Sequence, residues 1–252
     1  MQLFEYERAT HIMNAAGIDV ILATSRHGVG YLSDYWHPVS DQFYVLWDTE
    51  ATHMTVVGLP ADEKSEAFIV AGAFESTTLQ IMDPWIQDRR YWGPGYYIQT
   101  WGGDKPGPGD PTEHVAAALA ERGLSNGTIA VERRYLGVGY FDQLVERLPN
   151  VRFVDAEEIL WSLRKVKSVE EQRRLRECCQ ETAEVWLEVM HEAEAGMTEL
   201  DMMHQFTAKF AGRGMEPERT YVIFGPAGLD LKNGSPVPSI NPLKEGQFIR
   251  ID

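Results

Sequence analysis

Apolar positions along the first part of the chain switch repeatedly between a helical and an extended period. Helical spacing from Phe4 to Ala16, closed by Gly17, predicts a first helix, and the strand-like run 18–23 predicts a strand. Further strands are expected at 43–47, 53–57, 128–131 and 151–154, and further helices at 111–122 and 138–148. This alternation predicts an α/β domain over residues 1–155, with a mixed or parallel sheet.

An irregular stretch rich in aromatic residues lies between Pro84 and Pro111. Its aromatic residues stand among glycines and prolines: Trp85, Tyr91, Trp92, Tyr96, Tyr97 and Trp101. Loops of this length are uncommon in compact domains unless they serve a function. Two interpretations stay open: a binding lid or a loop that reaches a neighbouring subunit, and aromatic side chains that anchor the loop to its own domain.

The pattern changes after a connector at 156–167. Ser168 and Glu171 are spaced as a capping box, and apolar positions then follow one helical face for about seven turns, to Gly196. A second helix opens in the same way at Thr198. Its expected inward positions are Leu200, Met203, Thr207 and Phe210.

Two strands are expected after these helices, at 221–224 and at 246–252. Long capped helices followed by strands predict an α+β second domain over residues 156–252, and we expect this domain to be incomplete. The final strand carries Asp252 to its end.

Composition restricts the partners and the compartment. Net charge is −15, with 38 acidic against 23 basic residues, which argues against nucleic acid or an anionic membrane as a partner. No apolar run approaches a membrane span, and the first residues lack the pattern of a secretory signal, so the cytoplasm is expected. Cys178 and Cys179 are adjacent on a helix, where side chains diverge, so reduced, half-buried thiols are expected.

Several familiar functional motifs are incomplete or absent in this sequence. His191-Glu192 begins like a zinc helix, but Ala195 stands where a second histidine is needed. Gly137-Val138-Gly139 begins like a dinucleotide fingerprint, but Asp142 occupies the third glycine position. The chain has no phosphate-binding Gly-Lys-Ser/Thr and no Gly-x-Ser-x-Gly motif.

One ordered set of short motifs remains. It comprises Arg164…Lys167-Ser168…Glu171 before the long helix, then Gly196–Glu199, Phe224–Ala227 and Gly246–Asp252, with Val29–Tyr35 in the first half. In this order and spacing the chain resembles the pita-bread metallohydrolases, the family of aminopeptidase P, prolidase and creatinase. The resemblance spans nearly the whole chain.

The resemblance implies a site with two divalent metal ions (Mn, Co or Zn), bound by two Asp, one His and two Glu. Carboxylates and one imidazole suit such ions, which supply a hydroxide at neutral pH. In this sequence only Asp252 matches a metal ligand, and the other ligands are expected beyond it. The chain alone is therefore expected to bind no metal stably and to be inactive. The alternative is that Asp252 is an ordinary residue at a strand end.

Two departures from the family pattern concern the substrate. Peptidase members place a histidine after the Gly-Pro turn, but residues 232–238 contain none, which favours a non-peptide substrate. Creatinase places a Phe and an Arg where this chain has Ser40 and Gln42. The resemblance makes Trp36, His37 and Gln42 the candidates for substrate contacts across a homodimer, with core packing as the alternative for Trp36.

The function expected is a metal-dependent hydrolase that cleaves Xaa-Pro peptides or a small C–N substrate. Trp92, within the aromatic stretch, is a further candidate for substrate binding, because aromatic rings bind cationic ligands. The alternatives are an ectoine hydrolase-like enzyme, a lyase similar to those that cleave dimethylsulfoniopropionate, and a non-catalytic peptide-binding module. The expected partners are a small molecule or a short peptide, and a second copy of the chain.

Overall fold

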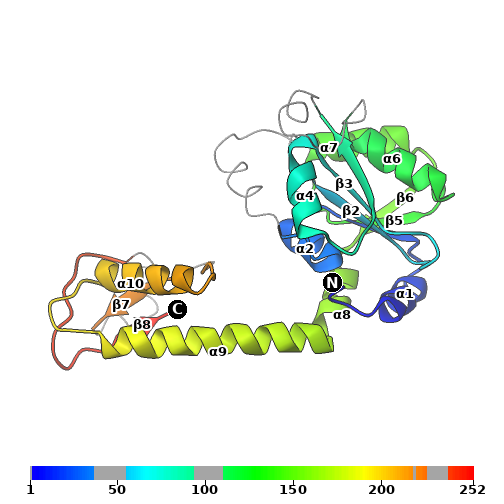
Figure 1. Cartoon of the computed structure of the whole chain (residues 1–252). Coiled ribbons are helices and arrows are strands. Elements are labelled where there is room, and N and C mark those ends of the chain that lie inside the picture. Colours follow the sequence, from blue (N-terminus) through cyan, green and yellow to red (C-terminus); the bar gives the residue numbers. More distant parts are fainter. Residues whose placement is uncertain (1, 37–54, 94–109, 218–219, 226–237) are drawn as a thin grey trace. The chain divides into compact units, whose positions relative to one another are not determined.

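The computed structural model of the chain describes residues 2–36, 55–93, 110–217, 220–225 and 238–252 (Figure 1). These residues form two compact units, Met1–Glu171 and Gln172–Asp252. Each unit has its own secondary structure and its own hydrophobic core. They are described in turn.

The first unit is built on a six-stranded sheet with the order β4-β3-β2-β1-β5-β6. Its strands are β1 (Val20–Ala23), β2 (Val56–Pro60), β3 (Phe68–Gly72), β4 (Asp88–Trp92), β5 (Thr128–Val131) and β6 (Arg152–Asp155). Strand β2 runs antiparallel to β1 and β3, and the other neighbours pair in parallel. The predicted mixed sheet is therefore confirmed.

Helices cover both faces of this sheet (Figure 1). They are α1 (Tyr6–Ala15), α2 (Arg26–Ser33), the 3-10 turn η1 (Ala73–Glu75), α4 (Ser76–Met82), α6 (Pro111–Glu121), α7 (Val138–Arg147) and α8 (Glu157–Lys165). Side chains of α1, α2, α4 and α8 join one core cluster, and those of α6 and α7 join the other.

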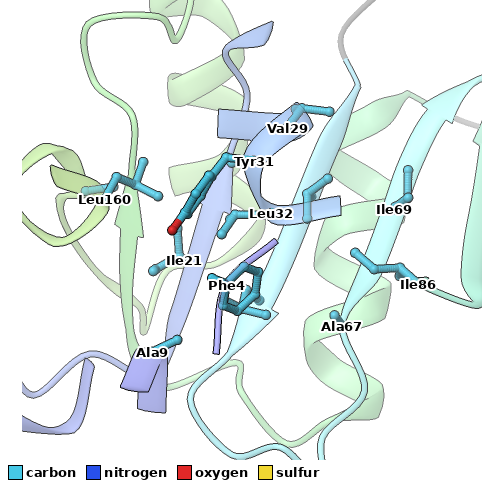
Figure 2. Close-up of a cluster of buried hydrophobic side chains, with 14 of the residues drawn as sticks. Phe4, Ala9, Ile21, Val29, Tyr31, Leu32, Ala67, Ile69, Ile86 and Leu160 are labelled. Atoms are coloured by element: carbon cyan, nitrogen blue, oxygen red, sulfur yellow. The ribbon is translucent and has the colours of Figure 1, made fainter. Parts of the chain in front are cut away.

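Strand β1 contributes to both clusters, because its successive side chains point to opposite faces. Ile21 and Ala23 pack in the cluster drawn in Figure 2, and Val20 and Leu22 pack in the other. All four residues are buried. A strand buried on both faces is a continuous apolar run, as in the sequence.

Several sequence predictions hold in the first unit, and others need correction. The helices predicted at 111–122 and 138–148 and the strands at 128–131 and 151–154 are present, with small shifts at their ends. The strand predicted at 53–57 is wrong in extent, because β2 begins only at Val56. Its expected partner at 43–47 lies outside the described residues.

Several elements of the first unit were not predicted from the sequence. Helices α2 and α4 and strand β3 were not predicted, and β4 forms within the stretch expected to be irregular. The connector expected at 156–167 is largely helix α8, whose Leu160 and Leu163 are buried in the core of this unit. Burial of these two leucines on one face stabilises the helix. The segment is too short for its apolar residues to show a clear helical period.

A close contact fixes the pairing of β2 with β3. Gly58 lies opposite Phe68, and a Cβ atom on Gly58 would lie 2.1 Å from Cζ of the Phe68 ring. The guanidinium carbon of Arg122 lies 4.9 Å from the centre of the same ring, and Arg122 donates to Asp88 at 2.7 Å. The ring therefore fills the space that a side chain at position 58 would need.

Glu75, at the end of η1 in the first unit, carries a fully buried carboxyl group. Its oxygens accept hydrogen bonds from the Thr55 hydroxyl at 2.7 and 2.8 Å and from the Tyr35 hydroxyl at 3.0 Å. Burial is the main cause that raises the pKa of Glu75 to about 7. The pKa of Tyr35 is raised as well, first by burial and then by the neighbouring Glu75.

The second unit contains two helices and one pair of strands. Its elements are α9 (Val169–His191), which begins in the first unit, α10 (Glu199–Gly212), β7 (Val222–Phe224) and β8 (Ile249–Ile251). The strands pair antiparallel, and Val185, Met202 and Phe206 centre a small core with them. Both predicted capping boxes form, at Ser168 and at Thr198.

Two expectations for these helices are wrong. On α10 Phe210 is buried as predicted. The other buried apolar positions are Met202 and Phe206 in place of Leu200, Met203 and Thr207, so most of the inward face is rotated from the predicted one. On α9 only Val185 and Val189 are buried, and Cys178 and Cys179 are free and exposed. In the described part of the chain, no helix is both long and apolar enough to cross a bilayer. The 23-residue helix α9 carries many charged side chains.

The Phe68 contact predicts that Gly58→Ala is destabilising. The added methyl group collides with the ring, which Arg122 and the core restrain, so the free energy of unfolding should fall by about 1–3 kcal/mol. Gly139→Ala is the matched control, because a Cβ atom there meets nothing within 4 Å on α7. Alanine should stabilise that helix by about 0.5–1 kcal/mol. Urea denaturation measures both, and equal effects would contradict the packing described.

The Glu75 carboxyl group predicts a pH dependence of stability. Its pKa rises from 4.5 to about 7 on folding, so the native state binds the proton more tightly. This contribution is fully present below about pH 4.5 and is lost as the pH rises through about 7. Between about pH 5 and about pH 8 the wild-type protein should lose about 2–3 kcal/mol through this group.

Glu75→Gln should remove this component of the pH dependence, since glutamine keeps the hydrogen-bond acceptor and cannot ionise. Glu146→Gln, an exposed position on α7, is the control and should leave the slope unchanged. The measurement is the free energy of unfolding in urea at several pH values. A slope in Glu75→Gln equal to that of the wild type would show that Glu75 does not titrate in this range.

Candidate functional site

Asp252 stands at the end of strand β8, opposite Tyr221. The register pairs Val222 with Ile251, and main-chain hydrogen bonds of 2.9 and 3.1 Å continue it to Tyr221 and Asp252. This pairing brings the two side chains together, and the Tyr221 hydroxyl donates to Oδ2 of Asp252 at 2.6 Å. The carboxylate is exposed, and Oδ1 has no hydrogen-bond partner among the described residues.

Glu199 fixes the segments that flank this strand pair. The side chain is buried at the start of α10, where a negative charge is favourable. Oε1 accepts from the main-chain N–H of Phe224 at 2.8 Å, and Oε2 accepts from the N–H and the hydroxyl of Ser239 at 2.9 and 2.7 Å. One carboxylate therefore connects α10, the end of β7 and the segment at Ser239.

From the sequence, Glu199 is expected only as part of a helix start. Its first signal was the Gly-x-Thr-Glu motif, which placed an acidic residue directly after the N-cap Thr198. The burial of that acid could not be read from the motif, because its partners Phe224 and Ser239 are distant in sequence. The structure assigns it a positioning role.

The described residues do not fit a metal centre by themselves. They contain no group of three or more His, Cys, Asp or Glu side chains that could hold an ion. Near the end of β8, the partner of Asp252 is the hydroxyl of Tyr221, and a single carboxylate is a weak ligand. Asp252 as a metal ligand stays a prediction.

The candidates for substrate contact lie in different surroundings. Trp36 is partly exposed, and its ring covers Gly30 of α2, where a Cβ atom would lie 2.5 Å from Cε3. Trp92 ends β4 and is only 8% exposed, inside the core cluster that contains Phe68. His37 and Gln42, together with Ser40, lie outside the described residues. A role in substrate binding stays a prediction for each of them.

The aromatic stretch is in part anchored to its own domain. The indole N–H of Trp85 donates to the main-chain oxygen of Leu32 at 3.0 Å, and its ring meets Phe4 edge to face. Tyr91 and Trp92 are buried on β4. For these three residues the structure favours the anchoring interpretation over a lid. Residues 94–109 lie outside the described part.

A buried carboxylate that the sequence analysis missed lies at the carboxyl end of β5. Glu132 accepts from the main-chain N–H groups of Thr24 and Ser25, both at 2.7 Å, and from the Ser25 hydroxyl at 2.7 Å. The signal was available, because Ser25 and Glu132 are polar residues that follow two apolar strands closely. Carboxyl ends of neighbouring parallel strands meet at one edge of a sheet, where ligands commonly bind.

Comparison with known proteins agrees with this architecture. A sequence model of the Creatinase/Prolidase N-terminal domain matches residues 6–166. Creatinase from a Bacillus species is 29% identical over 164 residues, which are 65% of this chain and 33% of that protein. The Bacillus subtilis protein named "Putative dipeptidase YkvY" is 26% identical over 228 residues, 88% of this chain and 57% of that protein.

Solved structures share the fold along nearly the whole chain. An Xaa-Pro dipeptidase from Bacillus anthracis aligns with a TM-score of 0.70 and 16% identity, over 97% of this chain and 58% of that one. The X-Pro aminopeptidase from Thermotoga maritima aligns with a TM-score of 0.68 and 15% identity, over 98% of this chain and 60% of that one. The predicted fold class is confirmed by this agreement.

The chain spans about a third to three fifths of the length of these proteins. The sequence model of the N-terminal domain covers more than half of the chain. The chain therefore belongs to the creatinase/prolidase family, of which it carries the N-terminal domain.

Proposed function

We propose that the protein containing this chain is a metal-dependent hydrolase that cleaves a C–N bond. The observation that carries the proposal is the exposed Asp252 carboxylate at the end of β8, in a chain of this family. Tyr221 holds one carboxylate oxygen and leaves the other free of partners in the described chain. Such a carboxylate is suited to serve as one ligand of a divalent cation, together with ligands from other residues.

The substrate class proposed first is the Xaa-Pro dipeptide. Proteins that share the fold along nearly the whole chain are named Xaa-Pro dipeptidase, X-Pro aminopeptidase and prolidase. A relative by sequence is likewise named as a dipeptidase. Divalent metal ions in such a centre polarise a carbonyl and supply a hydroxide at neutral pH.

A small non-peptide C–N substrate is the second candidate. Residues 232–238 contain no histidine, whereas the resemblance to the peptidases calls for one there. Creatinase is also among the relatives. Ectoine hydrolase-like chemistry belongs to the same class. Creatine and ectoine, assayed beside Ala-Pro and Gly-Pro, therefore separate the two candidates.

The role of the chain's own residues is to position the carboxylate. Pairing of β7 with β8 sets the Tyr221 and Asp252 side chains side by side, and the tyrosine hydroxyl restricts the carboxylate's rotation. Glu199 holds the end of β7 through Phe224. The Tyr221 hydrogen bond and the Glu199 hydrogen bond both lower the conformational entropy that Asp252 would lose on binding a cation.

Substitution of Asp252 tests the proposal. In the protein containing this chain, Asp252→Asn should lower kcat/KM by at least about 100-fold with Mn²⁺, Co²⁺ or Zn²⁺, because the ligand charge is lost. The control is Asp142→Asn, an exposed position on α7, which should change kcat/KM little. Circular dichroism checks that both variants fold. Full activity in Asp252→Asn would leave Asp252 an ordinary residue at a strand end.

The 252-residue chain studied alone is predicted to lack metal-dependent turnover, because its described residues form no group of metal ligands. Amino-acid release from Ala-Pro and urea release from creatine should stay at the level of a metal-only blank with each of the three ions. Turnover above that blank, removed by a chelator, would contradict this prediction.

The remaining alternatives give different outcomes in the same assays. A peptide-binding module would bind Xaa-Pro peptides in calorimetry and leave them intact. A lyase would release dimethyl sulfide from dimethylsulfoniopropionate and would not hydrolyse the dipeptides or creatine. Either result would replace the hydrolase proposal.

A further inference from the structure

A cavity of about 120 Å³ lies within the first unit, where three parallel strands end. Its walls come from the residues that follow β1 and β5, from the last residue of β6, and from helices α2 and α8. In open α/β sheets, ligands bind in the crevice at the carboxyl ends of the strands. All residues that line the cavity belong to the first unit, whereas Asp252 belongs to the second.

Three aromatic side chains, Tyr31, Tyr135 and Trp161, line this cavity. Tyr135 is 54% exposed and Trp161 is 51% exposed, although rings of this size are usually more buried. Tyr31 and Leu160 form the inner wall and are labelled in Figure 2. Exposed aromatic rings beside a buried apolar wall provide a surface for a planar or apolar ligand.

Arg164 adds a positive charge whose hydrogen-bond donors are free. Its guanidinium carbon lies 5.5 Å from the centre of the Trp161 ring and 6.0 Å from that of Tyr31. Among the described residues, the guanidinium has these ring contacts and no carboxylate or carbonyl partner. A guanidinium fixed by aromatic rings can form paired hydrogen bonds with a carboxylate.

The other charged groups of the lining are already engaged. Glu132 accepts three hydrogen bonds from Thr24 and Ser25, and Asp155 accepts one from the N–H of Glu157 at 3.0 Å. Nη1 of Arg134 lies 3.7 Å from Oε1 of Glu157. Arg133 donates to a main-chain oxygen at 3.3 Å. Arg164 is therefore the arginine of the lining whose guanidinium has no hydrogen-bond or ion-pair partner among the described residues, so its donors are available to an anion.

Tyr31 supplies a second, independent observation. Its side chain is 95% buried by accessible area, since only 5% is exposed, and its hydroxyl has no hydrogen-bond partner among the described residues. Burial is the main cause that raises the pKa of Tyr31 to about 12, so the hydroxyl stays a neutral donor at physiological pH. Leaving a buried hydroxyl unpaired is costly, which favours a partner from outside the described residues.

We propose that this cavity binds a small organic carboxylate with a planar or apolar body. The carboxylate binds to Arg164, and the body of the ligand lies against Trp161 and Tyr135. The cavity has roughly ten times the space that one water needs, which admits a ligand of several heavy atoms. It is well below the several hundred Å³ that larger ligands such as dinucleotides require.

Calorimetric titration of the 252-residue chain with benzoate tests the proposal. Benzamide has the same ring without the charge and should bind at least tenfold more weakly. Arg164→Met keeps much of the side chain's length and should weaken benzoate binding at least tenfold. Arg176→Met removes an exposed arginine of α9 and should leave the dissociation constant within about twofold.

Nuclear magnetic resonance of the tryptophan indole N–H groups locates the ligand. Benzoate should shift the Trp161 signal, assigned with Trp161→Phe, more than the signals of the other indoles. Tyr135→Ala removes an exposed ring and should weaken binding several-fold, which gives a second variant if Arg164→Met does not fold.

Four outcomes would overturn the proposal: no benzoate binding, equal binding of benzamide, an unchanged constant in a folded Arg164→Met variant, or an unshifted Trp161 signal. None of these measurements involves a metal ion or turnover. Their failure is therefore distinguishable from a failure of the proposed hydrolase function.

Discussion

Burial of strand β1 on both faces is the constraint from which the first unit follows. Its four residues pack alternately into two core clusters, so helices must cover both sides of the sheet. Its neighbours are β2 on one side and the parallel strand β5 on the other. Parallel pairing with β5 brings the residues after both strands to one edge, where Glu132 binds the main chain of Thr24 and Ser25. The same pairing creates the cavity at that edge, so the core and the binding surface have one origin.

In the second unit, too, strand pairing determines which side chains lie together. A short antiparallel pair, β7 and β8, packs on α9 and α10 through the core around Phe206. The pairing sets Tyr221 opposite Asp252, and this local register, with the hydroxyl contact, determines where the carboxylate points. Glu199 then fixes the flanking segments from within the core. The geometry of the candidate ligand is therefore a consequence of strand register.

The sequence predicts those features that depend on local pattern. Helices closed by glycine, both capping boxes and the apolar strands at 18–23 and 128–131 were found, because their signals lie within a few residues. Strand β3 was missed because an apolar run of five residues fits several structures equally well. The inward face of α10 was misplaced because the small core around Phe206, and not the periodicity, selects it. Glu132 and Glu199 were missed as site residues because their partners are distant in sequence.

Three buried carboxyl groups explain how the chain connects its irregular segments. Glu132 and Glu199 each accept from two main-chain N–H groups and one serine hydroxyl, so each negative charge is balanced by main-chain dipoles. Glu75 accepts from the hydroxyls of Thr55 and Tyr35, and its burial raises its pKa. Glu75 also accepts from the main chain of Gly72, and all its hydrogen bonds lower its pKa, but the effect of burial is larger and the pKa is raised. Main-chain donors cannot rotate away, so Glu132 and Glu199 each fix the segments that donate to them. In this protein buried acids therefore connect segments that are distant in sequence, and the one that burial perturbs most, Glu75, makes stability depend on pH.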